Sequence, residues 1–253
     1  MTETNNILPN WIDRQASPGP NVKVDSEQTE DNFFWYMLTL SCPLIFESYA
    51  MILHPFWINR KAKDLVASGL TLTDEQVDEQ DFISAKWVDF FKLYGHTFSL
   101  NTANQTQEII RQGLLNGGTK QIDWPVYIWF PGGGNCETED LKFILNSVKE
   151  LFGDDLVNYY YCLLKVKKME NEKILRGPIS EFDELKNKSD IRDSPTAIFP
   201  DNKKWCIVSD YDLPFTFVGG TKELVDKITS NNEFDIFKII PKLKEKILEN
   251  TSH

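Results

Sequence analysis

The sequence is poor in the motifs that the best-marked classes of enzyme share. Histidine occurs only three times in 253 residues. The chain has no glycine-rich phosphate loop followed by lysine, no G-x-G-x-x-G, no H-E-x-x-H and no G-x-S-x-G. The sequence therefore gives no support to a nucleotide-binding enzyme, a zinc protease or a serine hydrolase, and we expect no cofactor.

Cysteine is also scarce, and its positions are far apart. The cysteines are Cys42, Cys136, Cys162 and Cys206, and no two of them form a C-x-x-C pair. Zinc sites of the finger and ribbon types need clustered ligands, so this spacing argues against one. Three of the four lie in apolar, strand-like runs and no secretion signal precedes them, so we expect reduced thiols.

Basic residues are outnumbered, with 27 lysines and arginines against 38 aspartates and glutamates, and the formal net charge is -11. An acidic surface repels nucleic acid and anionic membranes at long range, so we expect neither as a partner. A basic protein is the compatible kind of partner.

Long uninterrupted apolar runs are absent. The most apolar stretch, residues 33–58, is interrupted by Pro43, Glu47, His54 and Pro55, which favours buried strands over a membrane span. The N-terminal residues are polar and lack the basic start and apolar core of a secretion signal. We therefore expect a cytoplasmic protein.

What the sequence does contain is a mixture of strand-like and helix-like segments. Residues 1–31 predict a poorly ordered or wrapping N-terminal segment, and residues 32–253 a single α/β domain. Strands are predicted over 35–40, 49–56, 126–130, 157–166, 173–176, 205–209 and 215–218, and helices over 61–67, 85–94, 105–115, 139–152, 222–228 and 241–248. Thr138 is the expected N-cap of the 139–152 helix and Gly153 its end. This mixture predicts an α+β fold with a largely antiparallel or mixed sheet and helices packed on it.

The last two predicted strands are joined by a segment that contains Asp210 and Asp212, which predicts a hairpin. Two carboxylates at this spacing are also compatible with Mg²⁺ or Mn²⁺. We favour the turn, because aspartate is a common turn residue, and we predict no metal. Arg176 is expected to form a structural ion pair with Asp210 or Asp212.

Three short motifs stand out along the chain. They are residues 49–55 (YAMILHP), residues 174–179 (ILRGPI), and a longer run with Ser194-Pro195, Phe199-Pro200-Asp201, residues 205–212 (WCIVSDYD) and residues 216–220 (TFVGG). In these motifs the chain resembles a group of uncharacterised bacterial proteins. The resemblance implies a shared fold and no particular activity, because one fold hosts many functions.

A chemically active cleft would draw on five candidate residues: His54, Arg176, Asp210, Asp212 and Cys136. Cys136 lies beside a predicted helix start, where the pKa of a thiol can fall, and His54 or His96 would serve as its base. Glu137 and Glu139 oppose this, because adjacent negative charge raises the pKa of a thiol. The favoured interpretations are a loop cysteine and a hydrogen-bonded buried His54.

A dense acidic stretch is the candidate binding feature. Its members are Asp74, Glu75, Asp78, Glu79 and Asp81. The mutual repulsion of these carboxylates is relieved by solvation or by a cationic partner. We therefore hypothesise a protein-binding or inhibitor protein, of the immunity type, that acts on a cationic partner. The alternative is an enzyme that uses Asp210 and Asp212 with a metal, or Cys136 as a thiol nucleophile.

Overall fold

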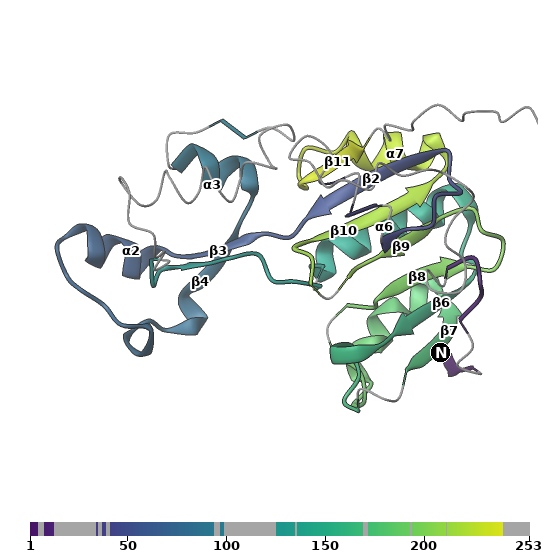
Figure 1. The fold of residues 1–253 in the computed structure, drawn as a ribbon, viewed down its shortest axis with the longest axis horizontal. Helices are drawn as coiled ribbons and strands as arrows, with labels where there is room; N and C mark the ends of the chain where they lie inside the picture. The colour runs from purple at the N-terminus through teal and green to yellow at the C-terminus, as the bar shows by residue number, and fades with distance from the viewer. Residues whose placement is uncertain are drawn as a thin grey trace, which may run out of the picture.

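The computed structural model describes a large antiparallel sheet, a smaller sheet at one end of it and helices packed on them (Figure 1). The predicted helices at 105–115 and 241–248, and His96, lie outside the described residues. No helix in the described part is both long and apolar enough to span a bilayer. The described residues are 1–4, 8–12, 34, 37–38, 41–93, 97–98, 125–134, 136–168, 172–192, 194–210 and 212–239.

The large sheet has eight strands, and every described pairing within it is antiparallel. This confirms the predicted α+β class and the largely antiparallel sheet. In spatial order the strands are β1 (Thr2–Glu3), β7 (Lys173–Pro178), β6 (Leu156–Tyr161), β8 (Ala197–Pro200), β9 (Cys206–Val208), β10 (Phe215–Gly220), β2 (Ser48–Leu53) and β11 (Ile236–Ile239).

A small module projects from one end of the large sheet (Figure 1). We use this name for residues 56–93 and 125–130. Its sheet consists of β4, β3 and β5, and only His54 and Pro55 separate β3 from β2 of the large sheet. The elements of the module are β3 (Phe56–Asn59), α2 (Arg60–Ala67), the 3-10 turns η2 (Asp74–Gln76) and η3 (Glu79–Asp81), β4 (Phe82–Ala85), α3 (Trp87–Leu93) and β5 (Ile128–Trp129).

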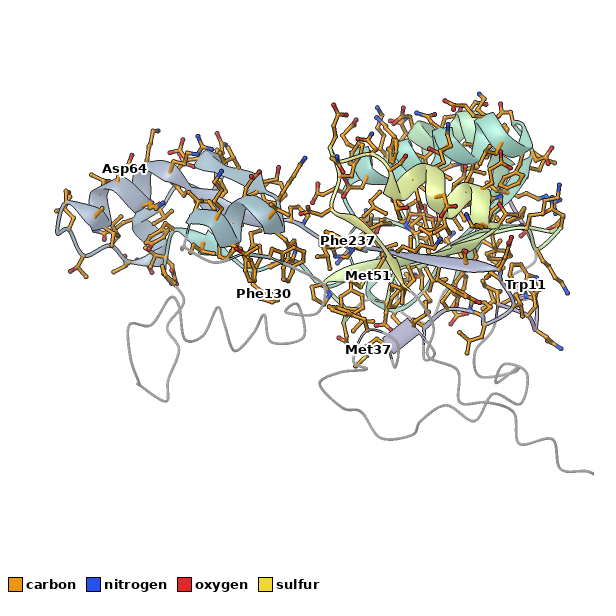
Figure 2. All side chains as sticks on the ribbon, turned by 90° about the horizontal axis from the view of Figure 1, so that it is seen from above. Trp11, Met37, Met51, Asp64, Phe130 and Phe237 are labelled. Atoms are coloured by element: carbon orange, nitrogen blue, oxygen red, sulfur yellow. The ribbon has the colours of Figure 1, made fainter. Side chains whose placement is uncertain are left out.

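Both faces of the large sheet are buried, as the run of six buried residues in β2 shows. Tyr49, Met51 and Leu53 pack on one face, whereas Ala50 and Ile52 pack on the other. Figure 2 shows α6 (Thr138–Phe152) and α7 (Lys222–Thr229) on one side of the sheet and Met37 and Trp11 on the opposite side. The 3-10 helix η5 (Ile179–Asn187) packs beside α6, and η4 (Leu163–Lys165) follows β6.

The helices follow the apolar spacing of the sequence. In α6, Leu141, Ile144, Leu145 and Val148 recur at helical intervals and are all buried. Gly153 ends this helix with a φ of +90°, as predicted, because glycine tolerates the left-handed region. The predicted N-cap was wrong by one residue: the cap position is occupied by Glu137, without a side-chain cap bond, and Thr138 is the first helical residue.

The predicted hairpin is confirmed, with β9 and β10 paired through Phe217 and Val208 and through Val218 and Ile207. Three strand predictions were wrong. The predicted 49–56 strand ends at Leu53, because His54 and Pro55 interrupt it and Phe56 begins β3 of the smaller sheet. Within 35–40 the described residues Met37 and Leu38 are helical, and the carbonyl of Leu38 accepts a bond from the Cys42 N–H at 2.8 Å. The 157–166 strand ends at Tyr161, because the chain turns into η4 with Leu163 at a φ of +52°.

The N-terminal residues follow the edge of the large sheet and one of its faces. Thr2 and Glu3 pair with β7, and the terminal amine of Met1 forms an ion pair with Glu181. Ile12 is buried, and the Trp11 ring packs edge-on against Phe199 at 5.5 Å between ring centroids. These residues therefore wrap around the sheet.

Phe217 offers a test of this core, because its side chain is fully buried at the centre of the β9–β10–β2 region. We expect Phe217→Ala to lower the free energy of unfolding by about 3–5 kcal/mol, through lost burial and the cavity left behind. Leu156, on β6 but 52% exposed, is the control, and its alanine variant should change stability by less than about 0.5 kcal/mol. Urea denaturation measures both, and equal losses would contradict the assigned core.

Candidate functional site

A buried hydrogen-bond network surrounds His54, where the chain leaves the large sheet. The imidazole Nδ1 lies 2.7 Å from the Gly132 carbonyl, and Nε2 lies 2.9 Å from the Thr216 hydroxyl. Because a carbonyl only accepts, Nδ1 carries the proton and Nε2 accepts from Thr216. The Ser209 hydroxyl in turn lies 2.6 Å from that of Thr216. His54 thus links β9, β10 and the glycine loop at 132–134.

Burial determines the protonation states in this network. It lowers the pKa of His54 to about 4, so the imidazole is neutral at physiological pH. The Cys136 thiol bonds to Thr216, and burial, aided by Asp140, raises its pKa well above the usual range. The structure thus brings His54 and Cys136 together, since both bond to Thr216. Because the Cys136 thiol is neutral and buried away from solvent, it is unsuited to act as a thiolate nucleophile.

The glycine loop is fixed from both sides. The Gly134 N–H donates to the Leu213 carbonyl at 2.8 Å, and the Cys136 N–H donates to Ser194 at 3.1 Å. The Ser194 hydroxyl donates to the Gly134 carbonyl at 3.2 Å. The start of α6 is therefore held in a defined position against the sheet.

The remaining residues of the predicted cleft lie elsewhere. Arg176 forms an ion pair with Asp201, so the expectation that it pairs with Asp210 or Asp212 was wrong. It lies on β7, which β6 and β8 separate from β9. Asp210 accepts the Asp212 N–H through its carboxylate at 2.9 Å, which is the interaction expected of a turn.

The acidic stretch at 74–81 forms η2 and η3 on the surface of the small module. Asp81 forms an ion pair with Lys61 at 2.9 Å, and the Asp78 carboxylate accepts the Gln80 N–H. Asp74, Glu75 and Glu79 are exposed. Local structure therefore explains two of the five carboxylates, and the other three face solvent.

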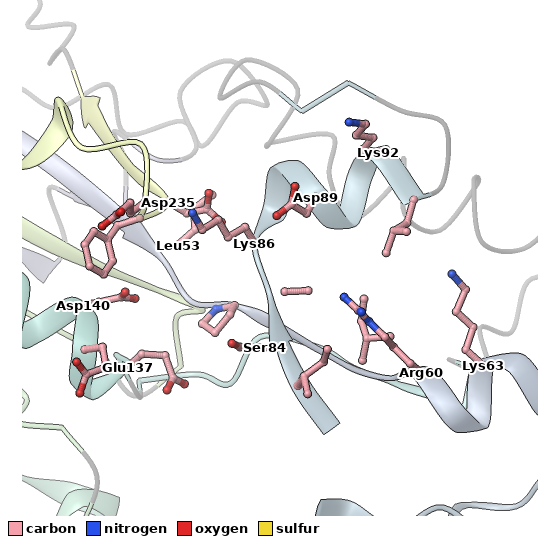
Figure 3. Close-up of a pocket in the computed structure, with 18 of the residues that line it drawn as sticks. Leu53, Arg60, Lys63, Ser84, Lys86, Asp89, Lys92, Glu137, Asp140 and Asp235 are labelled. Carbon is pink, nitrogen blue, oxygen red and sulfur yellow. The ribbon is translucent and has the colours of Figure 1, made fainter. Parts of the chain in front are cut away.

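A cleft of about 1010 Å³ lies between the large sheet and the small module (Figure 3). Its floor is apolar and includes Leu53, Pro55 and Ile58. Carboxylates line the side of the large sheet, which we call the acidic wall. Its members are Glu137, Glu139, Asp140, Glu233 and Asp235. The small module contributes Arg60, Lys63 and Lys92 across the cleft, together with the carboxylates Asp64 and Asp89.

The acidic wall has perturbed carboxyl groups. Burial, followed by the charges of Glu137 and Asp235, raises the pKa of Asp140 to about 7. Burial also raises the pKa values of Glu137 and Asp235. Lys86 counteracts this at Asp140 and Asp235 without restoring their ordinary values. A cleft with carboxyl groups this far from their usual pKa is a candidate binding site.

The two sides of the cleft are joined by specific contacts. Asp235 accepts the Trp87 N–H at 2.6 Å at the start of α3, and the Trp87 indole donates to the His54 carbonyl at 2.7 Å. Lys86 donates to the Asn232 carbonyl at 3.2 Å. The cleft therefore has a rigid junction at one end.

Sequence reasoning missed this cleft, although part of its signal is visible. Glu137, Glu139 and Asp140 lie close together at a helix start, and we interpreted Glu137 and Glu139 only through their effect on the pKa of the Cys136 thiol. Glu233 and Asp235 are almost a hundred residues away, and only pairing of β11 with β2 brings them beside α6.

Comparison of the chain with protein-family models, with curated proteins and with solved structures finds no match. The candidate site is therefore argued from its own geometry.

The buried His54 predicts a pH dependence of stability. Its pKa is about 4 in the folded chain and 6.5 ordinarily, so between these values the unfolded chain binds more protons. The contribution of His54 to stability is thus retained above about pH 6.5 and falls by about 3 kcal/mol as the pH decreases to 4, whereas the raised pKa of Asp140 acts in the opposite direction. In urea denaturation, the free energy of unfolding of His54→Gln should differ from that of the parent by a constant amount above neutral pH. As the pH falls from 6.5 to 4, the variant should lose less of this free energy than the parent. Identical acid slopes would contradict the buried, neutral imidazole.

Proposed function

We propose that this chain is a protein-binding protein, of the inhibitor or immunity type, that holds a cationic segment of its partner in the cleft. The observation that carries the proposal is the acidic wall, where Asp140 has a pKa of about 7. A carboxyl group shifted in this way lacks enough positive charge around it. A lysine or arginine of a partner would supply that charge.

The dimensions and lining of the cleft support a protein segment as the occupant. A cavity of about 1010 Å³ is at the upper end of the range for small-molecule sites, about 300–1000 Å³. The apolar floor would bury apolar parts of a bound segment, and the carboxylates of the acidic wall would orient its basic side chains. Arg60 and Lys63 across the cleft repel a uniformly basic segment from their side. This arrangement favours a segment whose basic side chains point toward α6.

The enzyme alternative has less support. Its thiol candidate, Cys136, is buried with a raised pKa, and Asp210 uses its carboxylate in a turn. Neither residue lines the cleft. The binding function is therefore the one that the geometry favours.

A labelled peptide whose lysines lie on one side, separated by neutral residues, tests the acidic wall. A cation prefers the ionised carboxylate, so affinity should rise from about pH 6 to about pH 8 as Asp140 loses its proton. Asp140→Asn should weaken binding at pH 8 by about tenfold, or about 1.4 kcal/mol, and flatten the pH profile. Fluorescence anisotropy measures both.

The matched control is Glu223→Gln, an exposed carboxylate on α7 that lies outside the cleft. It should leave affinity and its pH profile unchanged. Asp140→Asn should also stabilise the free protein above pH 7, on the order of 2 kcal/mol, because the folded state then no longer holds a destabilised charge. Equal weakening by both variants would mean that only net charge matters.

Binding kinetics should separate the acidic wall from the acidic stretch. Neutral replacements of Asp74, Glu75 and Glu79 together should slow association at low salt and leave dissociation unchanged, because exposed charges act at long range. Glu137→Gln should instead speed dissociation. Stopped-flow measurements with the same peptide at two salt concentrations check this, and an unchanged on-rate would leave residues 74–81 as a solvated surface.

A further inference from the structure

A second cavity, of about 370 Å³, lies on the other side of the start of α6. It is bordered by the first turn of α6, the end of β6, residues of η5 and the described residues from Lys188 to Arg192 with Ser194 and Pro195. None of the carboxylates of the acidic wall lines it. It is therefore a separate feature of the surface.

The charge of this cavity is opposite to that of the molecule. Lys186, Lys188 and Arg192 line it, and in the described part of the chain none of them has a carboxylate within ion-pair distance. The one carboxylate in the lining, Asp183, is paired with Lys142 at 3.1 Å. Three cations without an ion pair to any described carboxylate thus line one cavity of a protein whose net charge is -11, and Lys188 has a longer-range interaction with Asp190.

Tyr161 provides an independent observation. Its side chain is fully buried, it lines the cavity, and its hydroxyl has no hydrogen-bond partner in the part of the chain that the structure describes. Burial raises the pKa of this phenol above its usual range, so it keeps its proton. An unmet buried donor is unfavourable, and a ligand oxygen that accepts a hydrogen bond from this hydroxyl would relieve it.

The first turn of α6 forms one side of this cavity, and the Leu141 N–H there already donates to the Glu137 carbonyl. Its N-cap has no side-chain hydrogen bond, and the first N–H groups of a helix have no partner inside the helix. Thr138 and Leu141, one turn apart, line this cavity, whereas Glu137 and Asp140 line the cleft. The helix therefore presents its carboxylates to the cleft and a different face to the cations.

We propose that this cavity binds a phosphate group, either free or as the phosphomonoester of a small molecule. The three cations would neutralise the dianion, and the Tyr161 hydroxyl would donate to one of its oxygens. This site does not depend on the proposed binding of a cationic partner in the cleft.

The test is calorimetric titration of the full chain with inorganic phosphate and with glycerol 3-phosphate at constant ionic strength. Lys188→Gln and Arg192→Gln should each weaken binding by tenfold or more. Both side chains are at least partly exposed, so neither change should unfold the protein. Tyr161→Phe should weaken binding several-fold without lowering the melting temperature of the phosphate-free protein. Lys92→Gln, which removes the same charge from the cleft, should leave the affinity unchanged.

Tighter binding of glycerol 3-phosphate than of phosphate identifies a phosphomonoester site, and the reverse order identifies a site for free phosphate. The proposal is overturned if neither compound binds at millimolar concentration. It is also overturned if Lys92→Gln weakens binding as much as Lys188→Gln, because attraction would then come from charge alone.

Discussion

The hydrogen bonds of His54 fix the point where one sheet ends and the other begins. Its N–H donates to the Pro214 carbonyl, its carbonyl accepts from Trp87, and its two ring nitrogens bond to Gly132 and Thr216. An unmet buried polar group costs about 1–3 kcal/mol, so these four bonds together allow one arrangement of the segments. Pro55, which has no N–H, then ends the ladder of β2 and lets the chain enter β3.

The cleft is a consequence of that junction. One side belongs to the large sheet and its helices, the other to the small module, and Trp87 is held by both His54 and Asp235. The positive charge of Lys86 lowers the pKa values of Asp140 and Asp235 without restoring them to their ordinary range. Stability and the proposed binding of a cationic segment would make opposite demands on Asp140, whose raised pKa weakens the free protein at neutral pH.

The sequence predicted those elements whose apolar residues repeat at a regular local interval. The α6 helix, the α7 helix and the β9–β10 hairpin follow from such patterns. Short strands such as β8 and β11 were missed, because four residues carry too little pattern. The T-F-V-G-G motif was recognised in the sequence, but the need for glycine in it was not. A Cβ atom at Gly219 would lie 2.3 Å from the Phe46 ring, so only glycine fits there.

Long-range contacts could not be predicted at all. Thr216 and His54 are 162 residues apart, and Cys42 and Cys206 have sulfur atoms 3.6 Å apart across 164 residues. Arg176 found Asp201 as its partner because β7, β6 and β8 are neighbours in the sheet, and Asn158 of β6 also contacts Asp201. The candidate cleft shares this origin, since its two walls come from segments that only the sheet order brings together.

The helix dipole does not suffice to explain the carboxylates at the start of α6. Acidic residues in a first turn gain about 0.3–1 kcal/mol from the dipole, which would lower their pKa. Asp140 instead has its pKa raised from 3.8 to about 7, which corresponds to about 2–4 kcal/mol after allowance for partial exposure. Burial and neighbouring charge therefore outweigh the dipole. Carboxylates that served only to cap the helix would be more stable in water than in this partly buried position. A cation bound between Glu137 and Asp140 would make the buried position favourable.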